Sequence, residues 1–234
     1  MLIILLILSV IIYFIYKREN KEGNSKSGEL LGYEYVDLGL PSGNKWATCN
    51  VGANKPYEYG DYYAWGEIYT KLDYSAEEYK YKLNPTVLPN KADVAHFLLK
   101  GNWHIPSLKD FKELIACCEY NEKSLVGGVW GCEFKSKINS KKIFFPYTGF
   151  KIGMDLFAVS DGARYWSSSI NLDDLNEAFQ LLVTDGRLVP KIDVRERVTG
   201  CPIRPIFTDK KKNLSNESEP NVGPKRRLRS NSHL

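Results

Sequence analysis

Regular alternation of apolar and polar residues near the carboxyl end constrains the fold of this chain more than any other feature. Apolar residues are spaced two apart over 178–183, Asp185-Gly186 follows, and 187–198 alternates again. Alternate residues of a strand face opposite sides of a sheet, and Asp-Gly favours a two-residue hairpin turn. Alternation also marks 143–147, and Pro190 indicates a sheet edge or a bulge. The second half is therefore predicted to form an antiparallel sheet.

Two helices are predicted earlier in the chain. In the segment 106–118, Ser107 is a good N-cap and Asp110 completes a capping box. Its apolar residues then fall on one helical face: Leu108, Phe111, Leu114, Ile115 and Cys118. A shorter helix is predicted over 93–99. Helices followed by an antiparallel sheet place the chain in the α+β class.

Composition and charge narrow the function classes. The 234 residues are 43% apolar and 26% charged, as in an ordinary globular chain. The net charge of +4 comes from the end of the chain, because residues 209–234 hold seven Lys or Arg against three Asp or Glu. The body, 31–208, is close to neutral. Nucleic acid is therefore an unlikely partner for it.

The ends of the chain differ from the body. Residues 1–16 are apolar and uncharged, and a helix of that length spans about 24 Å. They predict a membrane anchor, with a secretory signal peptide that begins upstream as the alternative. Residues 17–30 predict a polar tether. Residues 209–234 predict a disordered basic tail.

Several blocks of the body resemble one family. They are 35–53, 58–67, 93–95, 101–107, 143–150, 164–169 and 198–206. In order and spacing they resemble the Fibrobacter succinogenes major paralogous domain family of Bacteroidetes, over nearly all of 33–207. His104 departs from the pattern, since the family usually carries Arg there, and Cys132 and Cys201 stand where Tyr is usual.

The resemblance implies a C-type-lectin-like fold, in which two helices flank a small antiparallel sheet beside a long loop region. It also implies an exported or surface-associated protein. The body is therefore expected outside the cytoplasm, although Lys17 and Arg18 after the apolar run favour the cytoplasmic side. Trp46, Trp65, Trp103 and Trp166 lie within family-like blocks and are predicted to be core residues.

The sequence offers little catalytic or metal chemistry. Three scattered histidines and five cysteines without zinc spacing predict no metal site. Nucleophile and phosphate-loop motifs are absent from the sequence, so neither an enzyme nor a cofactor is expected. Trp166-Ser-Ser-Ser lacks the side-chain oxygens that calcium-dependent lectins supply. The cysteines are expected as buried thiols, with Cys49 to Cys117 or Cys118, and Cys132 to Cys201, as alternative pairings.

A ligand site is expected in the loops that fold analogy makes long, 151–163 and 171–176. The polar candidates there are Asp155, Asp161, Asp173 and Asp174, and Trp130 is the tryptophan expected to be exposed. Eight tyrosines between positions 57 and 81 could add aromatic surface. The predicted function is non-catalytic binding of a glycan or a protein by a membrane-anchored module. The alternative is a structural or assembly domain without a small ligand.

Overall fold

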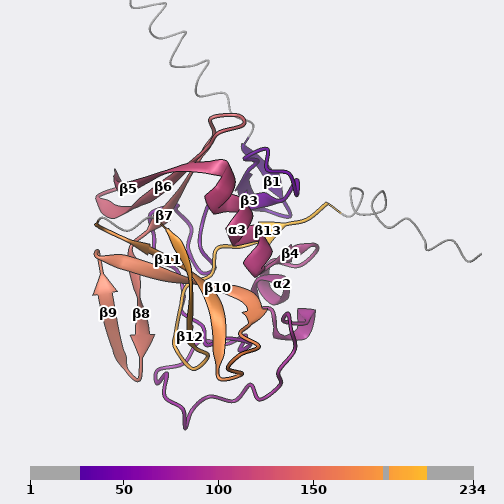
Figure 1. Ribbon diagram of the computed structural model, residues 1–234, viewed down its shortest axis with the longest axis vertical. Coiled ribbons are helices and arrows are strands. Elements are labelled where there is room, and N and C mark those ends of the chain that lie inside the picture. Colours follow the sequence, from indigo (N-terminus) through magenta and orange to yellow (C-terminus); the bar gives the residue numbers. More distant parts are fainter. Residues whose placement is uncertain (1–26, 187–189, 210–234) are drawn as a thin grey trace, which may run out of the picture.

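Three antiparallel or mixed sheets make up most of the molecule (Figure 1). The structure, a computed structural model, describes residues 27–186 and 190–209. Within these residues strands account for 42% and helices for 11%. The helical elements are the 3-10 turn η1 (Asn90–Ala92) and the α-helices α2 (Val94–Leu99) and α3 (Leu108–Cys117).

The N-terminal sheet has the order β1-β2-β3-β13-β4. Its strands are β1 (Ser27–Leu30), β2 (Tyr33–Val36), β3 (Lys45–Ala47), β13 (Ile206–Phe207) and β4 (Trp103–His104). Strand β13 pairs with β3 on one side and β4 on the other, so the end of the domain closes onto its beginning. Since β1 pairs with β2, Ser27–Leu30 belongs to the sheet, although these residues lie inside the predicted tether.

The central sheet has the order β12-β11-β10-β8-β9. Its strands are β8 (Thr148–Ile152), β9 (Asp155–Val159), β10 (Gly162–Ile170), β11 (Glu177–Thr184) and β12 (Lys191–Glu196). The predicted hairpin is confirmed, because β11 and β12 pair antiparallel with Phe179 opposite Val194. A third sheet joins β5 (Cys118–Val126), β6 (Val129–Ser136) and β7 (Lys142–Pro146).

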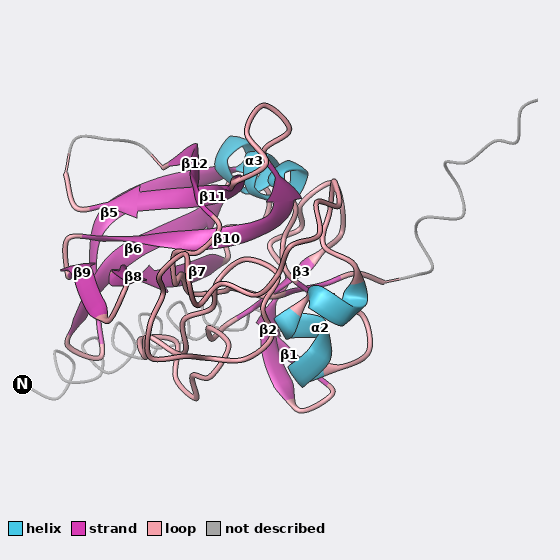
Figure 2. Ribbon diagram, turned by 90° about the horizontal axis from the view of Figure 1, so that it is seen from below, coloured by secondary structure: helices cyan, strands magenta, loops and turns pink. Residues whose placement is uncertain are grey.

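The predicted fold class is wrong. The chain is mainly β, and its two α-helices do not flank one small sheet. Helix α3 packs on the central sheet, whereas α2 packs beside β4 of the N-terminal sheet (Figure 2). The expected C-type-lectin-like arrangement is therefore overturned. The prediction undercounted strands because β5, β6 and the β8–β9 pair carry apolar residues on solvent-facing positions, which hides their alternation.

The predicted long loop at 151–163 is also wrong, because β8 and β9 pair as a hairpin through Gly153, whose φ of 55° suits a tight turn. The long irregular segment is instead 48–89, between β3 and η1, drawn in purple along the lower edge of Figure 1. Isolated bridges hold it to the rest of the fold, such as Tyr74 to Gly153.

Helix α3 confirms its sequence signals. Ser107 Oγ accepts from the backbone N–H of Asp110, and the Asp110 carboxylate accepts from the backbone N–H of Ser107 at 2.7 Å. Its buried residues Phe111 and Leu114 join a core with Trp46 and Phe145. The four tryptophans predicted to be internal are all buried, at 1% exposure or less.

The predicted single-pass membrane localisation is not supported. Across 27–186 and 190–209 the structure contains no helix that is both long enough and apolar enough to cross a bilayer. The predicted anchor at 1–16 and the tail from 210 onward lie outside the described residues.

Candidate functional site

The residues predicted to form a site do not come together. Asp161 precedes β10, whereas Asp173 and Asp174 follow it, so they lie at opposite ends of that strand. Asp155 begins the edge strand β9. Trp130 lies on β6 in another sheet, 39% exposed, with the Lys123 ammonium 5.6 Å from its ring. Of these five residues, Asp174 lines a cavity beside the central sheet.

That cavity has a volume of about 610 Å³ and lies where the long irregular segment meets one end of the central sheet. Three stretches of chain form its walls: residues 76–84, the turn 174–177 between β10 and β11, and 196–198 at the end of β12. We call it the Arg197 cavity. Its polar and aromatic lining is Tyr79, Tyr81, Lys82, Asn84, Asp174, Asn176, Glu177, Glu196 and Arg197.

Arg197 is the organising residue of the cavity and is only 5% exposed. Its guanidinium donates five hydrogen bonds of 2.7–2.9 Å, and the acceptors belong to two of the three wall stretches, 76–84 and 174–177. Four acceptors lie on 79–84: Tyr79 Oη, Asn84 Oδ1, and the carbonyls of Tyr81 and Leu83. The fifth is the carbonyl of Leu175. All five donors of the guanidinium are therefore used.

Aromatic rings surround the same charge. The guanidinium carbon of Arg197 lies 4.7 Å from the Trp65 ring centroid, 5.4 Å from Tyr79 and 5.7 Å from Tyr81. The structure gives Arg197 no ion pair with a carboxylate in the part of the chain it describes. The ring faces and the five neutral acceptors stabilise the buried cation instead.

Tyrosine hydroxyl groups hold the long segment in place. Tyr62 Oη donates to the carbonyl of Thr148, Tyr74 Oη to that of Tyr62, and Tyr79 Oη to that of Trp65, at 2.5–2.7 Å. All three side chains are buried, and burial raises the pKa of Tyr74 to about 12. Most of the eight tyrosines therefore serve the fold, and only Tyr69 is largely exposed, at 69%.

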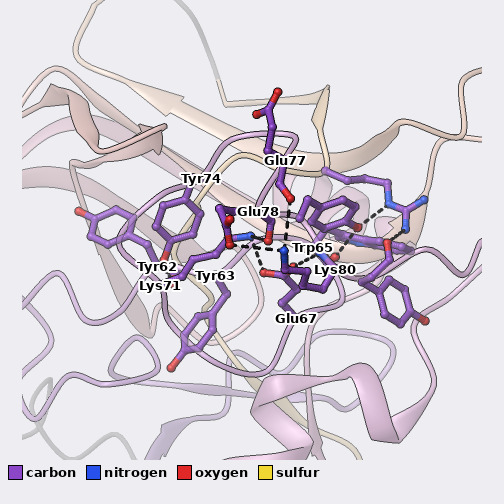
Figure 3. Close-up of polar contacts among 12 residues, drawn as sticks. Tyr62, Tyr63, Trp65, Glu67, Lys71, Tyr74, Glu77, Glu78 and Lys80 are labelled. Atoms are coloured by element: carbon purple, nitrogen blue, oxygen red, sulfur yellow. Dashed lines mark hydrogen bonds and ion pairs between the residues drawn. The ribbon is translucent and has the colours of Figure 1, made fainter.

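A second set of contacts closes this segment on itself (Figure 3). Lys71 Nζ lies 2.8 Å from Glu67 Oε2 and donates to the carbonyl of Glu78 at 3.1 Å. Glu67 Oε1 accepts from the backbone N–H of Lys80 at 2.6 Å. Two sets of contacts thus hold the cavity wall at 79–84 in place. Lys71 and Glu67, earlier in the chain, bind Glu78 and Lys80, and Arg197 binds four other residues of the wall.

Several polar groups of the cavity keep unused hydrogen-bonding capacity. Asp174 Oδ1 accepts from Asn176, and Glu177 Oε2 accepts from Asn171, so one oxygen of each carboxylate is uncommitted within the described chain. The exposed Glu196 carboxylate makes no ion pair or side-chain hydrogen bond with any described residue. Asn84 uses its carbonyl oxygen on Arg197, which leaves its amide NH2 as a donor.

The described residues contain neither a candidate metal site nor a disulfide. Over this part of the chain, His, Cys, Asp and Glu do not gather in any group of three that could hold a metal ion. All five cysteines are free thiols, so neither alternative pairing is present. Cys132 and Cys201 are fully buried, and burial raises the pKa of both thiols.

Sequence reasoning missed the central residue of the cavity. The alternation over 187–198 treats Arg197 as one more residue of the return strand. Nothing local distinguishes Arg197 from Arg195, because the acceptors that bury it are more than a hundred residues away along the chain in most cases. The sequence did contain one signal, the crowding of tyrosines at 57–81, because aromatic rings in such number need other side chains to pack against.

Comparisons with protein-family models, with curated proteins and with solved structures find no match to this chain. Membership of the Fibrobacter succinogenes major paralogous domain family therefore stays a prediction from the resemblance of the sequence blocks, and the site has to be interpreted from its own geometry.

Proposed function

We propose that this chain is a non-catalytic binding module that recognises a glycan in the Arg197 cavity. The observation that carries the proposal is the composition of the cavity wall, where two tyrosine side chains stand among carboxylates and amides that have unused capacity. Small-ligand sites are concave and combine aromatic surface with a few placed polar groups. The Arg197 cavity has this character.

A sugar ring matches these groups because each hydroxyl both donates and accepts a hydrogen bond. Glu196, and the uncommitted oxygens of Asp174 and Glu177, would accept from hydroxyl groups. The Asn84 amide and the Lys82 ammonium would donate to them. The ring of Tyr81 supplies an apolar surface for the C–H face of a sugar.

Rigid walls favour binding in this cavity. Arg197 joins 79–84 to the 174–177 turn through its five hydrogen bonds, so little chain has to be ordered when a ligand enters. A protein partner is the weaker alternative here, because protein interfaces extend over much larger and flatter surfaces than a cavity of about 610 Å³.

The test uses the full chain on an array of soluble oligosaccharides, followed by calorimetry with each sugar that binds. We expect Glu196→Gln to weaken binding about tenfold, since a hydrogen bond to a charged group contributes about 1.5–3 kcal/mol. The folded state should be unaffected, because the Glu196 carboxylate makes no ion pair or hydrogen bond within the described structure and the backbone contacts of Glu196 are kept.

Asp155→Asn is the matched control, because it removes an exposed carboxylate on β9, outside the Arg197 cavity. It should leave the affinity unchanged. Binding that survives Glu196→Gln but is lost in Asp155→Asn or Trp130→Ala would place the site elsewhere. An array on which no sugar binds would refute the proposed function.

A further inference from the structure

The face of the central sheet beside the Arg197 cavity carries a second, differently built group of arginines. Arg195 lies on β12, and Arg197 of the cavity follows the end of that strand by one residue. Ala178 lies opposite Arg195, and Gln180 lies opposite both Asp193 and Trp166. The register places Arg164, opposite Leu182, on this face as well. The face therefore runs across β12, β11 and β10, and β12 ends at Glu196, which lines the cavity.

Arg195 contrasts with Arg197. Its guanidinium carbon lies 4.8 Å from the centroid of Phe150, but it makes no hydrogen bond or ion pair with any residue that the structure describes. Its Nε is buried and has no partner. An arginine left in this state gives up hydration without regaining hydrogen bonds, which is a cost to folding.

Arg164 packs on the same ring. Its guanidinium carbon is 4.7 Å from the centroid of Phe150, and its Nε is also buried without a partner. Its Nη1 lies 3.6 Å from Asp193 Oδ2, and Lys191 Nζ lies 3.9 Å from that same oxygen. Arg164, Arg195 and Lys191 are thus three cations on this face, and the carboxylate of Asp193 is the single negative charge among them. Burial and the proximity of Arg195 lower the pKa of Arg164.

A buried glutamine on this face also has an unsatisfied polar atom, but this atom is an acceptor, which a carboxylate cannot pair. Gln180 is fully buried on this face, and its Oε1 has no hydrogen-bond partner. Its amide nitrogen makes only one long contact, 3.5 Å to the carbonyl of Val194. Two donors and one acceptor are therefore unsatisfied among neighbouring side chains, which is unusual for buried polar atoms.

We propose that the glycan bound by this chain is acidic, and that its carboxylate lies between the guanidinium groups of Arg164 and Arg195. This inference rests on the proposed function, because the sugar ring occupies the Arg197 cavity. A planar carboxylate accepts two parallel hydrogen bonds from a guanidinium fork. A single negative charge there relieves the repulsion between the two arginines.

The experiment compares each uronic acid oligosaccharide with its own methyl ester, which keeps the ring and removes the charge. The probes are oligogalacturonate and oligoglucuronate, titrated calorimetrically into the full chain at low salt. We expect the acid to bind at least tenfold more tightly than the ester, with a difference that shrinks as salt is added. In Arg195→Gln and Arg164→Gln the difference should fall to about twofold or less, while the affinity for the ester is kept.

Controls separate the possible sources of an anion. Acetate and inorganic phosphate, tested at the same concentrations, should bind at least tenfold more weakly than the uronic acid oligosaccharide. If either binds equally well, the arginine pair takes any small anion and the assignment to an acidic sugar is wrong. Lys135→Gln, on β6 of the three-stranded sheet, is the charge-matched control and should not change the ratio of acid to ester.

The two proposals fail in different ways. Equal binding of acid and ester by the unmodified chain overturns the acidic-glycan inference and leaves the proposed function standing. A preference for the acid that persists unchanged in both arginine variants also overturns it, because the charge would then be read elsewhere. A chain that binds neither these sugars nor any on the array refutes both.

Discussion

Replacement of Arg197 by lysine tests whether this residue holds the cavity together. The substitution keeps the positive charge and most of the side-chain length, but an ammonium group has three donors where the guanidinium has five. Five acceptors contact Arg197 in the structure. At least two of them must therefore lose their donor, and the planar arrangement that reaches both walls is lost.

The size of the effect follows from those acceptors. A buried polar group left without a partner costs about 1–3 kcal/mol. Two such groups give a loss of about 3 kcal/mol in the free energy of unfolding, and not the sum over all five bonds, because 79–84 can relax towards water. With a urea slope of about 2–3 kcal/mol per molar for a domain of this size, the midpoint should fall by about 1–1.5 M.

The measurement is urea unfolding of the full chain, followed by tryptophan fluorescence and by circular dichroism. Arg195→Lys is the control, since Arg195 lies two positions away along the chain and donates no hydrogen bond within the described structure. It should change stability by less than about 0.5 kcal/mol. Equal losses in the two variants, or a loss below that value in Arg197→Lys, would refute the role assigned to Arg197.

Three further outcomes follow from local contacts and are measurable by the same unfolding assay. Tyr74→Phe should lose about 1–2 kcal/mol because the carbonyl of Tyr62 loses its donor, whereas exposed Tyr69→Phe should lose nothing; similar effects would contradict this. Ser107→Ala should cost about 1 kcal/mol by removing the N-cap of α3, and no change would show that the cap is redundant. Burial raises the pKa of Asp93 in the folded state, so its contribution is full below the unfolded pKa of about 3.9 and is lost as pH rises through the folded pKa; the stability of the unmodified chain relative to Asp93→Asn should therefore decline from about pH 4 upward, and a constant difference would contradict the shift.

Local features of the sequence predicted the elements whose signals lie within a few residues. Helix α3 was predicted by its capping box and apolar face, and the β11–β12 hairpin by alternation and Asp185-Gly186. Burial of the large tryptophans was also predicted correctly. In these cases the residues that determine the structure are neighbours in the chain, so the pattern is visible without knowledge of the fold.

The arrangement of the elements was decided only by the tertiary structure. The predicted fold class was wrong because edge strands such as β9 expose their apolar side chains, with Phe157 43% exposed, and so lack an amphipathic pattern. Two of the predicted site residues, Asp155 and Asp161, were chosen from a predicted loop that is in fact the β8–β9 hairpin. Asp174 alone lines the cavity, through a turn that long-range pairing places beside 79–84.

Arg195 and Arg197 show the same limit most directly. They are the same residue type, two positions apart, with Arg195 on β12 and Arg197 just after the end of that strand. One donates five hydrogen bonds and the other, within the described chain, none. The alternation in the sequence treats the two alike, because it continues through both positions, whereas in the structure the strand ends between them, at Glu196. Which one is buried and saturated was decided by the distant segment 79–84, because hydrogen bonds depend on positions in space and not on separation along the chain.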